Sequence, residues 1–374
     1  MTGKERMLAA LNREVPDRLP CSIHQWQPYH LQAYMNGMDE LEAFRAVGLD
    51  AAIPFCEGME QMWVPRDPDT PDLSPDWQIH PQVLSRDPDD TVVRYTVTTP
   101  EGDLSYATGT NRYTTWITEC LIKEPERDVE LIEKYMPVPQ LDQERIAQVY
   151  DGIGDAGILR GFVWGEQAGC WQHACCLYGE EPMIYAAIDT PHWVHHLLEV
   201  LLAKKLQFIE ESLDGSRFDL VETGGGAGSS TVISPAMHEA FCLPYARRMH
   251  EACHAVGQKV VYHTCGGMMP LLDLIAANGC DASETLSPPE VGGDVRDIGE
   301  VNRRIGDRVA LVGGMNQFQV LTQGTPEDIR AEVHRLFEAA GPGGGYICSA
   351  CDHFFDAPPE NLKAFADAGR ECLY

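Results

Sequence analysis

Eight short apolar runs, separated by segments with helical periodicity, constrain the fold of this chain more than any other feature of its sequence. Each run is a few residues long, as expected for a strand buried on both faces of a parallel sheet. Eight such strands alternating with helices in 374 residues predict a (β/α)8 TIM barrel. The predicted strands are residues 19–24, 50–55, 158–164, 218–222, 259–263, 281–284, 309–313 and 346–349.

An open, doubly wound sheet is the competing architecture, because it also alternates strands with helices. The sequence lacks the usual dinucleotide signature of that fold, since no G-x-G-x-x-G follows the first predicted strand. The barrel is therefore the favoured fold class.

One stretch interrupts the alternation of strands and helices. Residues 92–99 and 104–107 predict a β-hairpin around a turn that contains Gly and Asp, and residues 114–122 predict a third strand. We therefore expect a single barrel domain over 1–374 that carries residues 64–122 as an inserted antiparallel β-rich subdomain.

The charge of the chain disfavours two classes of partner. Asp and Glu number 57 against 28 Lys and Arg, which gives a formal net charge of -29. Such a surface repels phosphate backbones and anionic headgroups, so neither nucleic acid nor a membrane is an expected partner. No apolar run approaches the ~20 residues of a membrane span.

The thirteen cysteines are odd in number and scattered along the chain, which does not resemble a disulfide framework. Reduced thiols fit this number and distribution of cysteines better than disulfides do. The first residues lead into an amphipathic helix rather than an export signal. Together these features predict a cytoplasmic protein.

Polar residues mark the carboxyl ends of the predicted strands, where the active site of a (β/α)8 barrel lies. His24 ends the first strand, Glu166 follows the third and Glu222 ends the fourth. We predict these three as catalytic residues. Glu222 or Glu166 could supply an oxygen ligand to a metal, accept a hydrogen bond from a metal-bound histidine, or bind substrate.

The fifth predicted strand ends in His263-Thr264-Cys265, followed by two glycines. Alternation along a strand puts His263 and Cys265 on one face, which makes half of a tetrahedral zinc site. Cys351, at the polar exit of the last strand, is the predicted third ligand, because Cys348 lies within that strand. Cys348 remains the alternative. Three protein ligands would leave the fourth position open, as in a catalytic zinc site.

A glycine-rich segment, residues 224–230, follows the fourth predicted strand. It lacks the Lys of a phosphate-binding Walker motif, so a loop that approaches a flat ligand closely is the better interpretation. Gly225 and Gly226, together with Asn316 after the seventh strand, are the predicted cofactor-binding residues.

Seven short motifs spread over nearly the whole chain resemble the uroporphyrinogen decarboxylase superfamily, and His-x-Cys-Gly at the fifth strand resembles its corrinoid-dependent methyltransferase branch. The resemblance implies a (β/α)8 barrel with Zn²⁺ held by His263, Cys265 and Cys351. It also implies a corrinoid (cobalamin) carried by a partner protein. The motifs lie at residues 6–11, 15–20, 233–235, 244–245, 263–266, 344–347 and 358–361.

The sequence departs from the decarboxylases after the first strand. Where they carry Arg-Gln-Ala-Gly-Arg for the substrate carboxylates, this chain has His24-Gln25-Trp26-Gln27. Four carboxylates on a tetrapyrrole need cations, and the predicted mouth offers few. The aromatic and Gln-rich loop suits a planar neutral substrate better.

The leading hypothesis is thus a zinc-dependent methyltransferase that moves a methyl group between a small substrate and the corrinoid of a partner protein. The substrate would be a methoxylated compound, a methylamine or a thiol. A uroporphyrinogen-type decarboxylase is the first alternative. A non-catalytic corrinoid-binding partner is the second.

Overall fold

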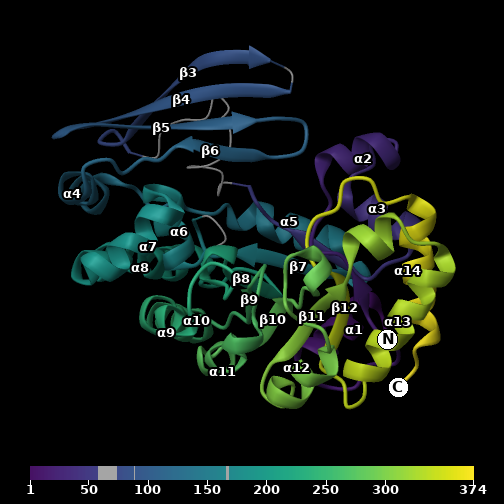
Figure 1. Cartoon of the computed structure of the whole chain (residues 1–374). Coiled ribbons are helices and arrows are strands. Elements are labelled where there is room, and N and C mark those ends of the chain that lie inside the picture. Colours follow the sequence, from purple (N-terminus) through teal and green to yellow (C-terminus); the bar gives the residue numbers. More distant parts are fainter. Residues whose placement is uncertain (58–73, 88, 166–167) are drawn as a thin grey trace.

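The computed structural model describes residues 1–57, 74–87, 89–165 and 168–374. Its central element is a parallel sheet of eight strands with helices around it (Figure 1). This confirms the predicted (β/α)8 barrel. Each predicted strand corresponds to an observed one, namely β1 (Cys21–Ser22), β2 (Ala51–Pro54), β7 (Gly157–Phe162), β8 (Leu220–Gly224), β9 (Val260–His263), β10 (Ala282–Thr285), β11 (Ala310–Met315) and β12 (Tyr346–Ala350).

The helices cover the outside of this sheet, with the exception of α1, which packs against β7, β11 and β12. No helix in the described part of the chain has the length and apolar character to cross a membrane. The helices are α1 (Gly3–Leu11), α2 (Pro28–Tyr34), α3 (Glu40–Val47), α4 (Pro125–Tyr135), α5 (Gln143–Ile153), α6 (Cys170–Tyr178), α7 (Glu180–Asp189), α8 (Pro191–Phe208), α9 (Pro235–Phe241), α10 (Leu243–Ala255), α11 (Leu272–Ala277), α12 (Ile298–Ile305), α13 (Pro326–Ala340) and α14 (Pro359–Glu371).

Alternate residues along the strands belong to two separate apolar clusters. The larger cluster lies between the sheet and the surrounding helices. The smaller one contains residues from seven strands and from α1, so it fills the barrel interior and α1 closes the barrel at one end. Its buried members are Met7, Ala10, Leu11, Ala52, Ile158, Leu220, Val261, Ala282, Ala310, Val312 and Ile347.

The barrel closes between β1 and β2, the two strands at the ends of the sheet order β1-β12-β11-β10-β9-β8-β7-β2. The backbone N–H of Asp50 donates to the carbonyl of Cys21 at 2.9 Å, and the Asp50 carboxylate accepts from the N–H of Cys21 at 3.2 Å. Arg6 and Arg18 donate to the same carboxylate at 2.7 and 3.0 Å. A buried ion cluster therefore supports this junction.

A second, antiparallel sheet follows β2 and consists of β3 (Gln78–Asp87), β4 (Asp90–Thr99), β5 (Gly102–Thr110) and β6 (Thr115–Glu119). The predicted hairpin is confirmed by β4 and β5, and the predicted third strand by β6. Strand β3 was not predicted, because its side chains are almost all exposed and show no alternation of apolar and polar residues. Of the predicted insertion, residues 64–73 and 88 lie outside the described part of the chain.

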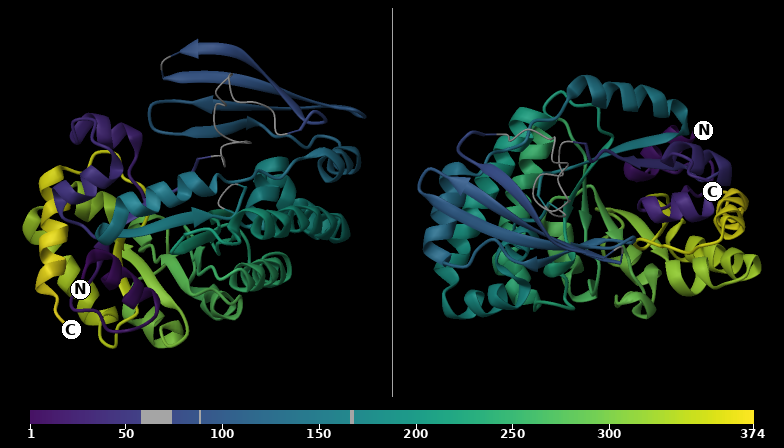
Figure 2. Two further views of the ribbon diagram at one scale, coloured as in Figure 1. Left: turned by 180° about the vertical axis from the view of Figure 1, so that it is seen from behind. Right: turned by 90° about the horizontal axis from the view of Figure 1, so that it is seen from above.

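The turn between β5 and β6 reaches from this sheet towards α2 (Figures 1 and 2). At its tip, the ring of Tyr113 lies 4.7 Å from that of Tyr29 on α2 and 5.1 Å from that of Phe355, which follows β12. The guanidinium of Arg112 lies over both tyrosine rings, 4.6 Å from Tyr113 and 5.4 Å from Tyr29. We call Tyr29, Arg112, Tyr113 and Phe355 the aromatic clasp. It joins the inserted sheet to α2, which follows β1, and to the loop after β12.

We expect Tyr113→Ala to release the tip of the inserted sheet, because it removes both ring contacts of the clasp. Amide hydrogen exchange in residues 111–114 should become faster by at least about two- to tenfold, the range expected for the loss of a single aromatic pair, because two pairs are lost. Tyr185→Ala, which removes a tyrosine that is 59% exposed, is the matched control and should leave these amides unchanged. Equal exchange rates in both variants would contradict a docked tip.

Candidate functional site

A polar layer lies directly above the apolar layer of the barrel interior. Side chains two positions apart on a strand share a face, so the residue two after each interior apolar residue also points inward. On four neighbouring strands that residue is charged or ionisable, and all four side chains are buried. The pairs are Ile158 and Arg160 on β7, Leu220 and Glu222 on β8, Val261 and His263 on β9, and Ala282 and Glu284 on β10.

Arg160 holds the two carboxylates of this layer together. Its Nη2 donates to Glu222 Oε2 at 2.7 Å and to the two oxygens of Glu284 at 2.8 and 3.0 Å. Burial of such charges is costly unless each finds a partner. A single guanidinium therefore makes it possible for two carboxylates to share the interior of the barrel.

The two carboxylates differ in their ease of ionisation. Burial and the neighbouring charge of Glu284 raise the pKa of Glu222 to about 7. Burial also opposes ionisation of Glu284, but Arg160 and the hydrogen bond from His263 outweigh it and lower the pKa of this carboxyl well below its usual value. Glu284 is thus the permanent anion of the pair, and Glu222 is the one that exchanges a proton near neutral pH.

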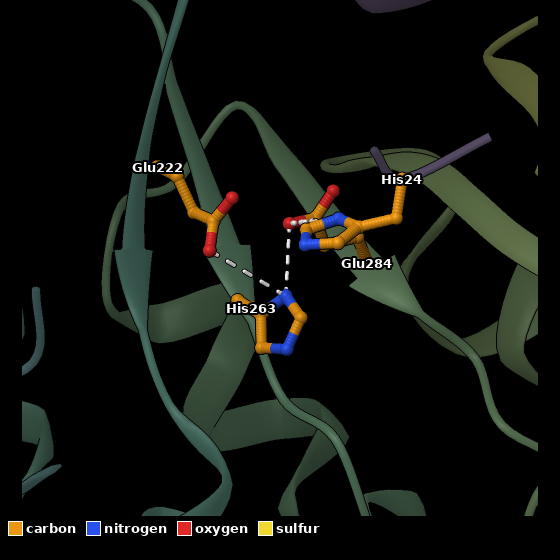
Figure 3. A group of neighbouring side chains, drawn as sticks. All are labelled: His24, Glu222, His263 and Glu284. Atoms are coloured by element: carbon orange, nitrogen blue, oxygen red, sulfur yellow. Dashed lines mark hydrogen bonds and ion pairs between the residues drawn. The ribbon is translucent and has the colours of Figure 1, made fainter. Parts of the chain in front are cut away.

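His263 joins this layer through one ring nitrogen only (Figure 3). Its Nδ1 lies 3.0 Å from Glu284 Oε1 and 3.7 Å from Glu222 Oε1. Because Glu284 is ionised, Nδ1 carries the hydrogen and donates it. The other nitrogen, Nε2, points away from the carboxylates, is buried and has no hydrogen-bond partner among the described residues.

The surroundings of His263 favour positive charge. Burial lowers its tendency to protonate, but Cys265 and Glu284 outweigh burial and raise the imidazole pKa well above its usual value. The ligand atoms of His263 and Cys265 lie within 4.8 Å of each other, so the predicted proximity is observed. The same surroundings that stabilise a proton on Nε2 of His263, beside the sulfur of Cys265, also attract a metal cation.

His24 enters the layer from the loop after β1. Its Nδ1 lies 3.7 Å from Glu284 Oε1, and its ring centroid lies 5.1 Å from that of His263 and 5.3 Å from that of His353. Burial lowers the pKa of His24 well below its usual value, so the ring is neutral. His353 in turn shares a 2.8 Å hydrogen bond with Gln27. His24 thus lies between the buried layer and the loop after β12.

Two groups of side chains in the described part of the chain have ligand atoms close enough to hold a metal ion. The inner group consists of His24, Glu222, His263 and Glu284, and the outer group consists of His263, Cys265 and Asp352; within each, the ligand atoms lie within 4.8 Å of one another. In the inner group, Arg160 already provides the positive charge that the carboxylates require. The outer group has no such cation, and it contains the unpartnered Nε2 of His263. The outer group is therefore the better metal site.

The third predicted ligand, Cys351, is not a member of either group. Its Sγ is buried and lies 3.9 Å from the carbonyl oxygen of Leu286, to which it donates. Burial raises the pKa of this thiol above its usual value. Cys348, the alternative, packs in the outer core, where its backbone pairs with Cys21 of β1. The residue beside the His263–Cys265 pair is Asp352.

The predicted cofactor-binding residues have structural contacts that account for their types. A Cβ on Gly226 would lie 2.7 Å from the sulfur of Cys265, so this glycine leaves room for the thiol. A Cβ on Gly225 would collide with Gln172, and its φ of 138° also favours glycine. The Asn316 side chain accepts from the backbone N–H groups of Phe318 and Gln319 and so caps the turn η6 (Gln317–Thr322). Their binding of a cofactor stays a prediction.

Glu166, one of the three predicted catalytic residues, lies outside the described residues.

The sequence interpretation missed Arg160 and Asp352. Arg160 could have been found, since it is two residues after Ile158 in an otherwise apolar run and must share its inward face. Asp352 had no comparable signal, because it lies in a loop where strand alternation does not apply.

The aromatic loop after β1 was interpreted as a substrate surface. Its Trp26, however, is 1% exposed and packs against Phe44 and Phe354.

Fold and site together define a (β/α)8-barrel enzyme with a charged site at the carboxyl ends of its strands. The family model "Uroporphyrinogen decarboxylase (URO-D)" matches residues 110–372, well over half of the sequence. The chain therefore belongs to the uroporphyrinogen decarboxylase family.

Two curated relatives, both named uroporphyrinogen decarboxylase, show how far the sequence similarity extends. The protein from Photobacterium profundum is 33% identical over 202 residues, which cover 50% of each chain. The protein from Coxiella burnetii is 25% identical over 386 residues, covering 97% of this chain and 94% of the relative. The match thus spans about half the length of several curated relatives and nearly all of others.

A solved structure shows the same fold over the whole chain. A methyltransferase from Methanosarcina mazei superposes with a TM-score of 0.67 at 18% sequence identity, covering 99% of each chain. At this identity the likeness is one of fold.

We expect Arg160→Met to destabilise the protein by about 3–5 kcal/mol, because it leaves two buried carboxylates without a cation. Without Arg160 the folded-state pKa of Glu284 rises above the value of the unfolded chain, ~4.3, and that of Glu222, already about 7, rises further. Stability is then lost as pH rises, so the deficit relative to wild type should be larger at pH 8 than at pH 5. Urea unfolding at pH 5 and pH 8 measures the difference in free energy of unfolding between the variant and the wild type.

The matched control for this prediction is Arg217→Met, which breaks a surface pair with Asp151 whose side chains are 46% and 68% exposed. We expect a cost of about 0–1 kcal/mol with little pH dependence. A similar, pH-independent cost for both variants would show that Arg160 does not neutralise the layer.

Proposed function

We propose that this protein is a zinc-dependent methyltransferase that moves a methyl group between a small substrate and the corrinoid of a partner protein. The substrate would be a methoxylated compound, a methylamine or a thiol. The observation that carries the proposal is the buried, unpartnered Nε2 of His263 beside Cys265. The name of the Methanosarcina relative, a methyltransferase with the same fold, supports it.

The donor set of the outer group fits zinc, which binds imidazole nitrogen, thiolate sulfur and carboxylate oxygen in proteins. When bound, zinc would supply Lewis acidity to the heteroatom of the substrate, and the corrinoid would supply the cobalt that exchanges the methyl group. Three ligands from the chain would leave one position for the substrate.

The chain's own residues prepare this site. Glu284 accepts the Nδ1 hydrogen of His263 and so orients the lone pair of Nε2 outward, as partners of metal-bound histidines do. Arg160 keeps Glu284 ionised, which preserves this orientation. Gly226 leaves the space that the Cys265 sulfur occupies. Neutral His24 lies beside His263, with the two ring centroids 5.1 Å apart.

The decarboxylase alternative has the curated names in its favour, but the charges of the site do not suit a tetracarboxylate. Arg160, the guanidinium of the buried polar layer, is bound by two carboxylates of the protein itself. A substrate with four carboxylates would need cations that are free to pair with it. The net charge of -29 adds a repulsion for any polyanion.

The same charge suits an enzyme that binds neither nucleic acid nor an anionic membrane. None of the thirteen cysteines, all of them within the described residues, forms a disulfide. Both features support a cytoplasmic location with reduced thiols.

We expect the purified protein to contain about one zinc ion per chain and His263→Ala to contain little, because it removes the nitrogen ligand. Metal analysis measures this. Cys120→Ser, which changes a half-buried thiol outside both ligand groups, is the control and should retain zinc.

Activity should depend on zinc in the same way. With free Co(I) cobalamin as acceptor, wild type and Cys120→Ser should give the absorbance of methyl-Co(III) with a methylated substrate, and His263→Ala should not. A wild-type protein without zinc would contradict the proposal. So would release of carbon dioxide from uroporphyrinogen that persists in Cys265→Ser, since this result favours the decarboxylase.

A further inference from the structure

The third protein ligand of the zinc site can be identified from its position. The ligand atoms of His263, Cys265 and Asp352 lie within 4.8 Å of one another. Zinc bonds of ~2.0–2.3 Å place tetrahedral ligands ~3.3–3.8 Å apart. Side-chain adjustments of about 1 Å therefore bring these atoms to bonding positions around one ion.

The carboxylate of Asp352 is partly buried and fixed on one side. Its Oδ1 accepts the backbone N–H of His353 at 2.7 Å and lies 3.7 Å from the His353 ring. Its Oδ2 has no hydrogen-bond partner among the described residues. The side chain is 32% exposed, so it lies between the buried layer and solvent. One oxygen thus orients the carboxylate and the other is available to a metal.

The loop that carries Asp352 is held on both sides of this position. His353 shares its hydrogen bond with Gln27, and Phe355 packs in the aromatic clasp against Tyr113. Before it, the N–H of Cys351 donates to the carbonyl of Met315 at 3.0 Å and continues the sheet. These contacts keep Asp352 beside the pair, and they keep the sulfur of Cys351 near Leu286.

We infer that Asp352, rather than Cys351, is the third zinc ligand, and that the resulting nitrogen, sulfur and oxygen set selects a methyl ether as substrate. This inference rests on the proposed function. A carboxylate donates less electron density than a thiolate, so zinc with a single thiolate is the harder Lewis acid and prefers oxygen. A site with two thiolates would suit a sulfur substrate better.

The transfer balances with the reactants of the proposed function. The bond between the methyl carbon and the ether oxygen breaks, and its electron pair stays on oxygen, which takes a proton from water. The methyl carbon bonds to Co(I) of the corrinoid through an electron pair from cobalt, which is formally oxidised to Co(III). The products are an alcohol or phenol and a methylated corrinoid.

The test replaces zinc by Co²⁺, whose sulfur-to-metal charge-transfer absorption reports the number of bound thiolates. We expect the band to vanish in Cys265→Ser, to remain unchanged in Cys351→Ser and to roughly double in Asp352→Cys, which adds a second thiolate. Asp352→Asn should weaken Co²⁺ binding at least ~100-fold, since the loss of residues that only support a ligand already costs 10–100-fold.

The substrate class is tested on the Co²⁺ protein with an isosteric pair, 2-methoxyphenol and 2-(methylthio)phenol. The oxygen compound should perturb the spectrum of the wild type more, and Asp352→Cys should reverse this preference. No response to 2-methoxyphenol, or a stronger response to the sulfur compound in the wild type, overturns the substrate assignment.

The experiment distinguishes a failure of the role of Asp352 from a failure of the proposed function. A band that falls by half in Cys351→Ser, with Co²⁺ affinity retained in Asp352→Asn, overturns the role of Asp352 and leaves the proposed function standing. A wild-type protein without any band that depends on Cys265 overturns the proposed function itself.

Discussion

The guanidinium of Arg160 lies between two carboxylates inside the barrel, and the rest of the site depends on this contact. Glu222 and Glu284 are both almost fully buried, and neither could remain charged there alone. Arg160 makes the largest favourable contribution to the ionised form of Glu284. Its Nη2 lies between the two carboxylates and donates to both at once.

The orientation of His263 follows from that anion. Glu284 accepts the Nδ1 hydrogen of the imidazole, so Nε2 faces the opposite side, where Cys265 and Asp352 lie. The buried layer and the metal site are thus consecutive parts of one arrangement. Arg160 fixes the charge of Glu284, Glu284 fixes the ring of His263, and the ring presents a nitrogen to the mouth. A free cation for an anionic substrate is not part of this arrangement.

Much of this could be predicted from the sequence because strands impose simple rules. All eight barrel strands were identified from short apolar runs, and alternation correctly put His263 and Cys265 side by side. The same rule applied to Ile158 and Arg160 predicts the central cation, because the two residues share the inward face of one strand. In the loops, where side chains do not alternate as they do in strands, the site residues were predicted less well.

The loops show why. The proposed third ligand lies after β12, where the chain leaves the sheet, and the position of Asp352 depends on contacts of His353 and Phe355 with residues more than 200 positions away. No local pattern encodes such contacts. The glycines after β8 were correctly recognised as permitting close approach, but the group that approaches Gly226 is the sulfur of Cys265.

The proposed site requires a zinc ion bound to Nε2 of His263, outside the layer that Arg160 neutralises. Anomalous diffraction from crystals of the purified protein, recorded above and below the zinc edge, tests it most directly. The account predicts one peak about 2.0–2.1 Å from His263 Nε2. A peak among His24, Glu222 and Glu284 would contradict it, as would the lack of any peak at this site.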